Sequence, residues 1–390
     1  MGKKFYTPDG FTDILPDDCA YKRTLEGSLR NLFAMNGYQE IETPGVEYCD
    51  VYSATGFVKE EDLYKFTDQK GRLLCARYDG TVPAARFAAG IFRDEPLPIR
   101  LSYIENMYRF NQMGGGKQSG FTQAGIELLG ARGAASDAEV IALAIKSALE
   151  IGITDLQVSI GQTEFFDGLA RQFNLSDEDK EDIKEAVSCK DSVMIEKKAS
   201  GLNSEDRQTI TMLTECSGTY DTIEQFEGRV TDAKALNALR NIRNILDILD
   251  KYGYTRYITV DLGLFGSVDY YTGVIFKCYT YEVGFPIMSG GRYDSMSKVF
   301  GRDLEAVGFS MSLTLAITAM MRQGKKLEKS GAGTIVGGKT DLAIATAEKL
   351  RAQGFPAILD TTGMNEDELN RYAALKGIET VLYMREGDAE

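Results

Sequence analysis

The spacing of apolar residues predicts a helix close to the start of the chain. After Pro16, the residues Leu25, Leu29 and Phe33 recur at intervals of four, which places them on one helical face. Gly37 marks the end of this pattern, because glycine readily adopts the left-handed conformation that closes a helix. The first predicted element is therefore an amphipathic helix between Pro16 and Gly37.

Shorter apolar runs, bounded by glycine, proline and polar residues, predict strands further along the chain. The expected strands cover residues 38–44, 73–76, 99–110 and 121–130. Two helical patterns accompany them, at residues 82–92 and 137–152, the second with Ser136 or Asp137 as its N-cap and Gly152 at its end. Strands that pair as hairpins and are covered by helices predict a mixed α+β domain.

The middle of the chain changes character, because residues 161–252 are rich in charged helical patterns and lack strand signals. Strand patterns resume in the sequences RYITVDLGL, YYTGVIFKCYTYEV and AVGFSMSLTLAI. After a polar linker, residues 331–390 alternate strand and helix as a small parallel α/β unit does. We therefore expect a core of residues 1–160 and 253–322, a helical insertion at 161–252 and a small C-terminal domain at 331–390.

Composition excludes several classes of chemistry. The 390 residues include no histidine, so neither a Ser-His-Asp triad nor a histidine metal site can be built. The six cysteines lack CxxC spacing, and we expect no metal, no cofactor and no disulfide scaffold. A net charge of −14 makes a broad nucleic-acid footprint unexpected. No apolar run is long enough for a membrane span and no signal peptide is visible, so a cytoplasmic protein is expected.

One short motif suggests a nucleotide site. The sequence GTIVGGKT, residues 333–340, fits the G-x-x-x-x-G-K-T pattern of a phosphate loop and would assign Lys339 and Thr340 to phosphate. In a phosphate loop the glycines turn after a strand, whereas here the apolar residues inside the motif form the strand themselves. A phosphate-loop nucleotidase therefore stays only as an alternative function.

A second group of residues points to a small polar ligand. If residues 121–130 form a strand, Gln123, Gly125 and Glu127 lie on one face, with open space between an amide and a carboxylate. The segments DYYTG at 269–273 and GGRYD at 290–294 place tyrosines next to aspartates in strand-rich sequence. A solvated sheet face explains the first segment equally well, and each of the others is unspecific alone.

Taken in order, these segments resemble the catalytic core of histidyl-tRNA synthetase, a class II aminoacyl-tRNA synthetase, over about residues 5–318. The resembling stretches are YTPDGFTDILP, the helix and strand that end at Pro44, RYDGT, YRF with the following glycine loop, GFTQAGIELLG, DYYTG, GGRYD and GFSMSL. The resemblance implies a class II synthetase-like core: a mixed, mostly antiparallel sheet with flanking helices. The stretch that ends at Pro44 resembles the family's dimer contact, which implies a dimer.

Departures from the synthetase pattern remove the groups that activate ATP. Gly266 and Leu315 stand where the family has arginines, and Asn111 stands where it has a glutamate. The loss of two cations removes charge stabilisation from adenylate formation. The C-terminal piece resembles a shortened anticodon-binding domain, but its 6 Lys and Arg against 10 Asp and Glu make tRNA binding unexpected.

A synthetase-like core with an eroded ATP site resembles the regulatory subunits of ATP phosphoribosyltransferase, a family of histidine biosynthesis. This resemblance implies a non-catalytic protein that activates a short-form catalytic subunit and binds histidine for feedback inhibition. An active histidyl-tRNA synthetase stays as the alternative enzyme. The partners expected are the catalytic subunit, a second copy of the chain and histidine, without a membrane.

The resemblance also implies a set of histidine-binding residues. Asp79, Thr81 and Gln123 would bind the ammonium, and Glu127 and Tyr271 would bind the two imidazole nitrogens. Arg109 is the nearest candidate for the carboxylate in place of the missing arginine. The walls of the cavity would be formed by two further tyrosines, Tyr270 and Tyr293.

Overall fold

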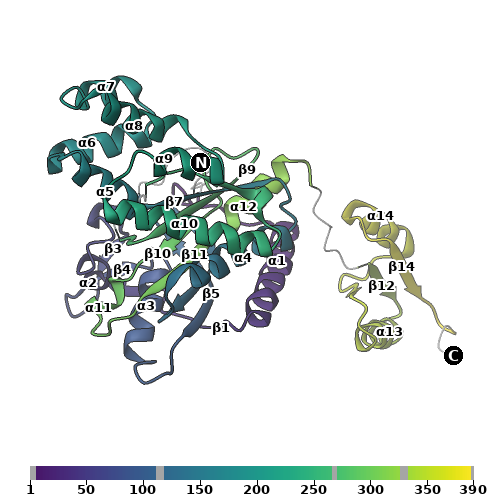
Figure 1. The fold of residues 1–390 in the computed structure, drawn as a ribbon. Helices are drawn as coiled ribbons and strands as arrows, with labels where there is room; N and C mark the ends of the chain where they lie inside the picture. Colours follow the sequence, from purple (N-terminus) through teal and green to yellow (C-terminus); the bar gives the residue numbers. More distant parts are fainter. Residues whose placement is uncertain (1–5, 111–117, 266–269, 326–332, 388–390) are drawn as a thin grey trace. The chain divides into compact units, whose positions relative to one another are not determined.

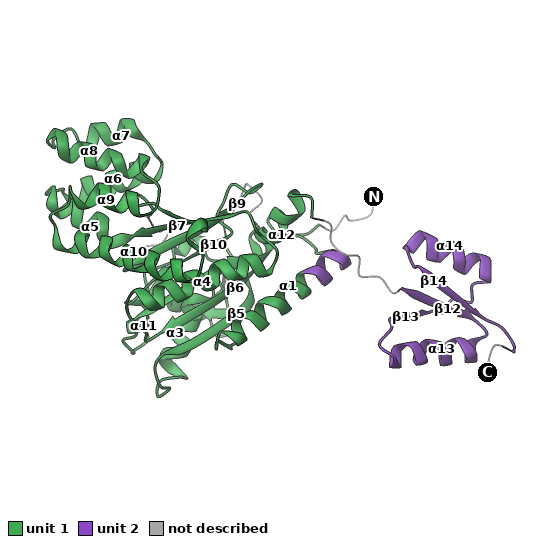
Figure 2. Cartoon of the chain, turned by 45° about the vertical axis from the view of Figure 1, so that its right-hand side comes forward, with its two compact units in different colours: residues 1–14, 22–326 green, residues 15–21, 327–390 purple. Residues whose placement is uncertain are grey.

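A computed structural model of the protein describes residues 6–110, 118–265, 270–325 and 333–387 (Figure 1). The chain divides into two units, one of residues 1–14 and 22–326 and the other of residues 15–21 and 327–390 (Figure 2). Each unit has its own sheet and apolar core. The segment 111–117, which holds Asn111 and most of the glycine loop, and the position of Gly266 lie outside the described residues.

The larger unit is built on one extended sheet. Its strands are β1 (Gln39–Glu40), β5 (Ile99–Tyr108), β6 (Gly120–Leu129), β7 (Leu156–Gln162), β8 (Ile258–Val260), β9 (Val274–Thr280), β10 (Met288–Arg292) and β11 (Ala306–Ser312). Their order is β1-β5-β6-β11-β10-β9-β7-β8. The outermost pairs, β1–β5 and β7–β8, are parallel, and every pair between them is antiparallel. The predicted mixed, mostly antiparallel sheet is confirmed.

Helices cover this sheet, and the first of them forms as its apolar spacing predicts. They are α1 (Pro16–Met35), α3 (Thr81–Gly90), α4 (Gly133–Glu150), α11 (Met296–Val299) and α12 (Leu313–Arg322). In α1, Leu25, Leu29 and Phe33 are buried, and the ring of Phe33 meets that of Phe309 in β11 edge-on at 6.3 Å. Gly37 adopts the expected left-handed conformation, with φ at 81°.

The predicted N-cap of the helix at 137–152 is wrong. Because α4 begins at Gly133, Ser136 and Asp137 lie inside its first turns, where both are buried. The guanidinium of Arg292 at the end of β10 donates to Asp137 Oδ1 at 2.6 and 2.9 Å and to Ser136 Oγ at 2.8 Å. These polar side chains therefore attach the helix to the sheet, because a buried guanidinium needs charged and polar partners.

A block of helices lies between β7 and β8. It contains α5 (Thr163–Gln172), α6 (Asp177–Ser188), α7 (Ser192–Lys198), α8 (Ser204–Glu215), α9 (Tyr220–Glu227) and α10 (Ala233–Lys251). α10 packs against both α5 and α4, so the last helix of the block also covers the core (Figure 1). The apolar side of α10 includes Leu239, Ile242 and Leu249, which are fully buried. A short 3₁₀ turn, η2 (Thr255–Tyr257), then leads into β8.

A second, smaller sheet packs beside the N-terminal part of the core. Its strands β2 (Val46–Tyr48), β4 (Leu73–Ala76) and β3 (Lys65–Thr67) are antiparallel, and α2 (Cys49–Ser53) and the 3₁₀ turn η1 (Glu60–Asp62) belong to the same segment. Cys49, Tyr52 and Cys75 are buried in one apolar cluster with Leu101 of β5 and Tyr293. This cluster supports the segment Arg77–Thr81, which connects β4 to α3.

The C-terminal unit is the small parallel α/β fold that its sequence predicts. Its elements are β12 (Thr334–Gly338), α13 (Thr340–Ala352), β13 (Ala357–Leu359), α14 (Glu366–Lys376) and β14 (Thr380–Met384). Ile335 packs with Leu369 of α14, while Val336 packs on the other face with Ala343 and Ala347 of α13. Alternate residues of a strand thus bury both faces of the sheet.

The phosphate-loop match is formal only. β12 contains five residues of the motif, and α13 starts at Thr340, so only Lys339 connects the strand to the helix. Such a connection is too short to form a glycine-rich loop around a phosphate. Lys339 instead donates to Glu386 at 2.9 Å.

Candidate functional site

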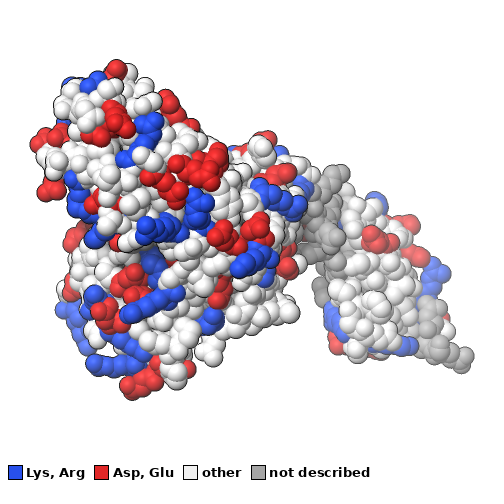
Figure 3. All heavy atoms as spheres, viewed as in Figure 1, with Lys and Arg blue, Asp and Glu red and all other residues white. Residues whose placement is uncertain are grey.

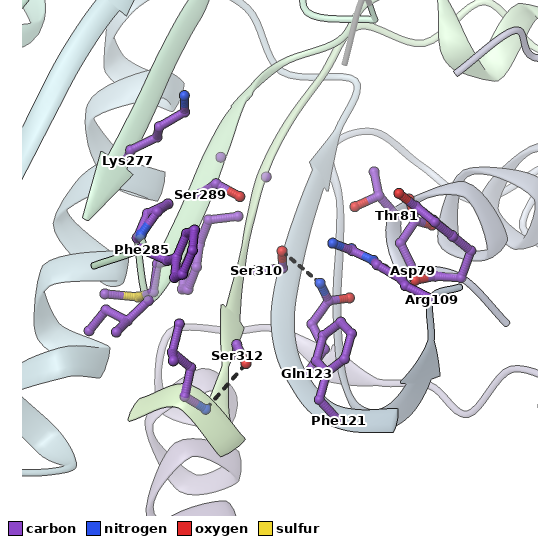
Figure 4. A pocket seen from close by; sticks show the side chains of 18 of the residues that line it. Asp79, Thr81, Arg109, Phe121, Gln123, Lys277, Phe285, Ser289, Ser310 and Ser312 are labelled. Atoms are coloured by element: carbon purple, nitrogen blue, oxygen red, sulfur yellow. Dashed lines mark hydrogen bonds between the residues drawn. The ribbon is translucent and has the colours of Figure 1, made fainter. Parts of the chain in front are cut away.

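A cavity of about 380 Å³ opens over the central strands of the larger unit (Figure 4). Seven of the eight side chains predicted to bind histidine line it: Asp79, Thr81, Arg109, Gln123, Tyr270, Tyr271 and Tyr293. The eighth, Glu127, is fully buried and is not among the lining residues. Segments that lie far apart in the sequence therefore meet at one place, as the resemblance implies.

The register of the sheet explains why one strand can hold both an amide and a carboxylate in this site. In the pairing of β6 with β11, Gln123 faces Ser312, Gly125 faces Ser310 and Glu127 faces Gly308. Alternate residues of a strand share a face, so all three β6 residues lie on one side of the sheet. The alternative of a solvated face does not apply, because Gln123 and Glu127 are buried.

Gln123 is held in place from two sides. Its Oε1 accepts a hydrogen bond from the backbone N–H of Gly80 at 3.1 Å, and its Nε2 donates to Ser310 Oγ at 2.9 Å (Figure 4). The first bond joins β6 to the segment that carries Asp79 and Thr81. A side chain fixed in this way presents its remaining hydrogen-bonding capacity in one direction, which is what recognition of a small polar ligand requires.

Asp79 is buried at the start of α3. Its Oδ1 accepts a hydrogen bond from the backbone N–H of Val82 at 3.1 Å, and its backbone oxygen accepts from the hydroxyl of Tyr52 at 3.3 Å. Burial raises the pKa of Asp79, although the nearby positive charge of Arg109 opposes this shift. A carboxylate in such a place gains stability from any cation that enters the cavity.

Glu127 lies against the cavity at a position without a side chain on the neighbouring strand. Its Oε2 occupies the space that a Cβ at Gly308 would need, and Gly308 itself lines the cavity. The hydroxyl of Tyr103 donates to Oε1 at 3.3 Å, and the hydroxyl of Tyr293 donates to Oε2. Burial raises the pKa of Glu127 to about 8, although hydrogen bonds from Tyr293, Thr81 and Tyr103 oppose the shift.

Three tyrosines form one wall. The ring of Tyr270 lies 4.6 Å from that of Tyr271 and meets the ring of Tyr293 edge-on at 6.0 Å. Phe57 meets Tyr270 from behind at 5.2 Å. Burial raises the pKa of Tyr271 to about 12, so its hydroxyl, protonated at neutral pH like that of any tyrosine, stays protonated further into the alkaline range. The wall is therefore rigid and aromatic, and since the hydroxyl of Tyr293 already donates to Glu127, the hydroxyl of Tyr271 is left to donate to a ligand.

Arg109 lies near Asp79 and Thr81, on the side of the site opposite to Lys277 (Figure 4). Its guanidinium carbon is 4.6 Å from the ring centre of Tyr78 and 5.1 Å from that of Phe121. Its Nε donates to the backbone oxygen of Tyr78 at 3.1 Å. The guanidinium is thus already held by an aromatic face and a carbonyl.

Sequence patterns did not identify several residues of this site. Among them are Lys277 in β9, Ser289 in β10 and Ser310 in β11, which lie in one cross-strand row. A row of this kind depends on the register of three strands, which no single segment of sequence specifies. Gly308 was likewise noted only as the first residue of the GFSMSL stretch. Its close approach to Glu127 depends on the pairing of β6 with β11.

Leu315 lines the same cavity from the first turn of α12. The structure therefore places an apolar residue at the site where the synthetase family has its second arginine.

No group of three or more cysteine, aspartate or glutamate side chains suited to a metal ion occurs among the described residues. None of the described helices is both long and apolar enough to cross a membrane.

Comparison with known proteins defines the class. Residues 10–315 match the sequence model of the family described as Histidyl-tRNA synthetase. A crystal structure of histidyl-tRNA synthetase from a Nostoc species has a TM-score of 0.82 and 21% identity, over 97% of this chain and 90% of that chain. The fold is that of a class II histidyl-tRNA synthetase.

Closer relatives carry a more specific name. The ATP phosphoribosyltransferase regulatory subunit of Acetivibrio thermocellus is 42% identical, over 97% of this chain and 92% of the relative. A crystal structure described as an ATP phosphoribosyltransferase regulatory subunit/histidyl-tRNA synthetase, from Bacillus halodurans, has a TM-score of 0.88 and 29% identity, over 98% and 99% of the two chains. The chain belongs to the family of ATP phosphoribosyltransferase regulatory subunits, and the predicted non-catalytic role is confirmed.

Proposed function

We propose that this regulatory subunit binds histidine in the described cavity and controls a short-form ATP phosphoribosyltransferase catalytic subunit. In this proposal the protein activates the catalytic subunit in the first step of histidine biosynthesis and transmits inhibition when histidine accumulates. The names of the relatives support a catalytic partner. The chemistry of the cavity supports histidine as the ligand.

The observation that carries the proposal is the pair of buried carboxylates at the cavity. Asp79 and Glu127 both have raised pKa values because burial disfavours their charged forms. Histidine carries an ammonium at one end and a ring N–H at the other, and each can bind one carboxylate. A ligand with only one cationic or N–H group could contact only one of the two buried acidic groups, and the other would keep just the contacts that the protein supplies.

The roles of the other residues follow from their positions. Thr81 and the fixed amide of Gln123 complete the ammonium end, near Asp79. The hydroxyl of Tyr271, which like any tyrosine hydroxyl is protonated at neutral pH, donates to the second imidazole nitrogen. Tyr270 and Tyr293 flank the imidazole as the aromatic wall.

A second copy of the chain is the other partner that we propose. β1 is an edge strand of the main sheet, and both of its residues are exposed. Val46, Tyr48 and Phe66 are exposed on the small neighbouring sheet. An unpaired sheet edge and exposed apolar side chains each favour association, and a closed two-fold dimer is the usual result. Sedimentation equilibrium should give twice the mass of the chain, and a monomer at micromolar concentration would contradict the dimer.

Three further expectations belong to the same proposal. The limits of the core, the helical insertion and the C-terminal domain are those stated from the sequence, and the site of action is the cytoplasm. Transfer RNA is not a partner in this proposal. Basic and acidic side chains are interspersed on the face of the larger unit seen in Figure 3, so this face offers no continuous basic surface to a polyanion such as RNA.

Calorimetric titration with histidine and with ATP tests the ligand. We expect histidine to bind and ATP not to bind. Glu127→Ala should weaken histidine binding by roughly 2–5 kcal/mol, because a buried polar group of the ligand loses its charged partner. Glu61→Ala, which removes an exposed carboxylate, is the matched control and should leave binding unchanged. Binding of ATP would instead favour a synthetase or a nucleotidase.

A further inference from the structure

An amino acid also brings a carboxylate, and the cavity offers two basic side chains for it. Among the lining residues that the structure describes, only Arg109 and Lys277 carry a positive charge. They lie on opposite sides of the site, with Arg109 beside Asp79 (Figure 4). The choice between them decides how the ligand is oriented.

Arg109 is poorly placed to take the carboxylate. Its guanidinium lies between the rings of Tyr78 and Phe121, and its Nε already donates to a backbone oxygen. Its charge also offsets the buried charge of Asp79. A turn of the guanidinium toward a ligand would break these contacts and leave Asp79 with less support, which disfavours the exchange.

Lys277, by contrast, is well placed to bind the carboxylate. It lies on β9 directly across from Ser289, which lies across from Ser310, so the three side chains form one row on the cavity face of the sheet. Neighbouring strands are about 4.8 Å apart, so the backbones of Lys277 and Ser310 lie roughly 10 Å apart, and the flexible four-carbon side chain of Lys277 can cover part of that distance. Ser310 in turn bonds to Gln123. The row is a polar path from Lys277 to the amide that contacts the ammonium end.

The ammonium of Lys277 has room for another acceptor. Its Nζ donates to the backbone oxygen of Phe265 at 3.3 Å, and a lysine ammonium has three donors. Asp261 is the charged group that acts on it, and burial outweighs this attraction, so the pKa of Lys277 is lowered. A bound carboxylate would supply the missing negative charge.

We propose that Lys277, with the hydroxyls of Ser289 and Ser310, binds the α-carboxylate of the amino-acid ligand and thereby makes the cavity selective for amino acids over the corresponding amines and alcohols. This inference rests on the proposed histidine site and adds the specificity residue that the sequence did not reveal. It replaces Arg109 in the role expected from the sequence. The row explains why the cavity extends across β10 to β9, beyond the tyrosines and the strand that bind the ring and the ammonium.

Calorimetry with two ligands tests the inference: L-histidine and L-histidinol, in which a hydroxymethyl group replaces the carboxylate. The natural protein should bind histidine more tightly than histidinol by roughly 10- to 100-fold, as expected for a hydrogen-bonded charged group. In Lys277→Met the affinity for histidine should fall by that factor and the affinity for histidinol should stay unchanged. Lys277→Arg should keep most of the preference, and Lys70→Met, a change at an exposed lysine, should keep all of it.

The outcomes distinguish a failure of the proposed histidine site from a failure of the role given to Lys277. If the natural protein binds neither ligand, the histidine site itself fails and this inference fails with it. If it binds histidine but Lys277→Met keeps the full preference over histidinol, the site stands and Lys277 is not the carboxylate partner. An equal loss for both ligands would show that Lys277 only supports the fold of the cavity. Thermal unfolding of each variant, and Lys277→Gln as a second neutral replacement, exclude a folding defect as the cause.

Discussion

Tyr293, which follows β10, donates its hydroxyl to Oε2 of Glu127 in β6, and both side chains are buried beside the cavity. Tyr103 donates to the other carboxylate oxygen. Within the described part of the chain no salt bridge reaches Glu127, so hydroxyl groups alone oppose the cost of burying its charge. Its pKa is accordingly raised to about 8. A cation or an N–H donor that enters the cavity would therefore favour the charged form of Glu127.

The raised pKa of Glu127 should make the free protein less stable as the pH rises. The folded state binds this proton up to about pH 8, whereas an unfolded glutamate releases it near pH 4.3. Between these values the folded state holds more protons, so the free energy of unfolding falls as pH rises, by at most ~1.4 kcal/mol per unit. Glu127→Gln should flatten this slope in urea unfolding at pH 5 to 8, while Glu61→Gln should not. Identical slopes in all three proteins would refute the assignment.

Histidine binding should release protons at pH 7.5. A ring N–H that donates to Glu127 favours its charged form, so the pKa of Glu127 falls on binding and its proton is lost. The affinity for histidine should therefore rise between pH 6.5 and 8. Calorimetry in buffers with different ionisation enthalpies measures the number of protons released, and Glu127→Gln should reduce it. Proton uptake by the natural protein would contradict this arrangement.

The sequence predicted the elements of this fold better than the contacts between them. Apolar spacing located α1, and a short apolar run between glycines located β6, because these signals are local to the element. The cap assigned to Ser136 or Asp137 was wrong because the two residues bond to Arg292, which lies far away in the sequence. A local capping rule cannot detect a partner of that kind.

The same limit applies to the site. Gln123 and Glu127 could be assigned to one face from the period of a strand, and seven predicted residues do line one cavity. The resemblance to a family supplied most of that set, since chemistry alone left a solvated face equally possible. Lys277 could not be predicted as a site residue because its position depends on the register of β9 with β10 and β11. Register is a tertiary property, set by the strands together.

Gly308 is expected to be essential to the site although it has no side chain. A Cβ at this position would overlap Oε2 of Glu127. Two tyrosine hydroxyls, one on each oxygen, fix this carboxylate, so it cannot move aside freely. Gly308→Ala should therefore cost at least as much histidine affinity as Glu127→Ala, and should lower stability by roughly 1–3 kcal/mol as overpacking does. Gly284→Ala, where a Cβ meets no atom within 4 Å, is the control. Unchanged binding in Gly308→Ala would show that Glu127 is not a ligand.

The protein should not form histidyl adenylate. Leu315 lines the cavity where the synthetase family has an arginine, so a cation that stabilises the transition state is missing. Histidine-dependent exchange of pyrophosphate into ATP should stay at the background level. A synthetase of known activity, assayed in parallel, checks the assay. Turnover in the range of ordinary enzymes, about 1–10³ s⁻¹, would contradict the prediction.

The last prediction concerns the complex with a short-form ATP phosphoribosyltransferase from the same source. Mixing the two proteins should give a stable hetero-oligomer in size-exclusion chromatography and raise the rate of phosphoribosyl transfer to ATP, and histidine should then inhibit the complex. Inhibition through the regulatory subunit requires that histidine bind the less active state more tightly, with a coupling of ~1–3 kcal/mol. Glu127→Ala should therefore weaken inhibition but not activation, because Glu127 is buried at the cavity and away from any surface that a partner could contact. Loss of activation together with inhibition would place the site in the interface, and two separate species with an unchanged rate would exclude this partner.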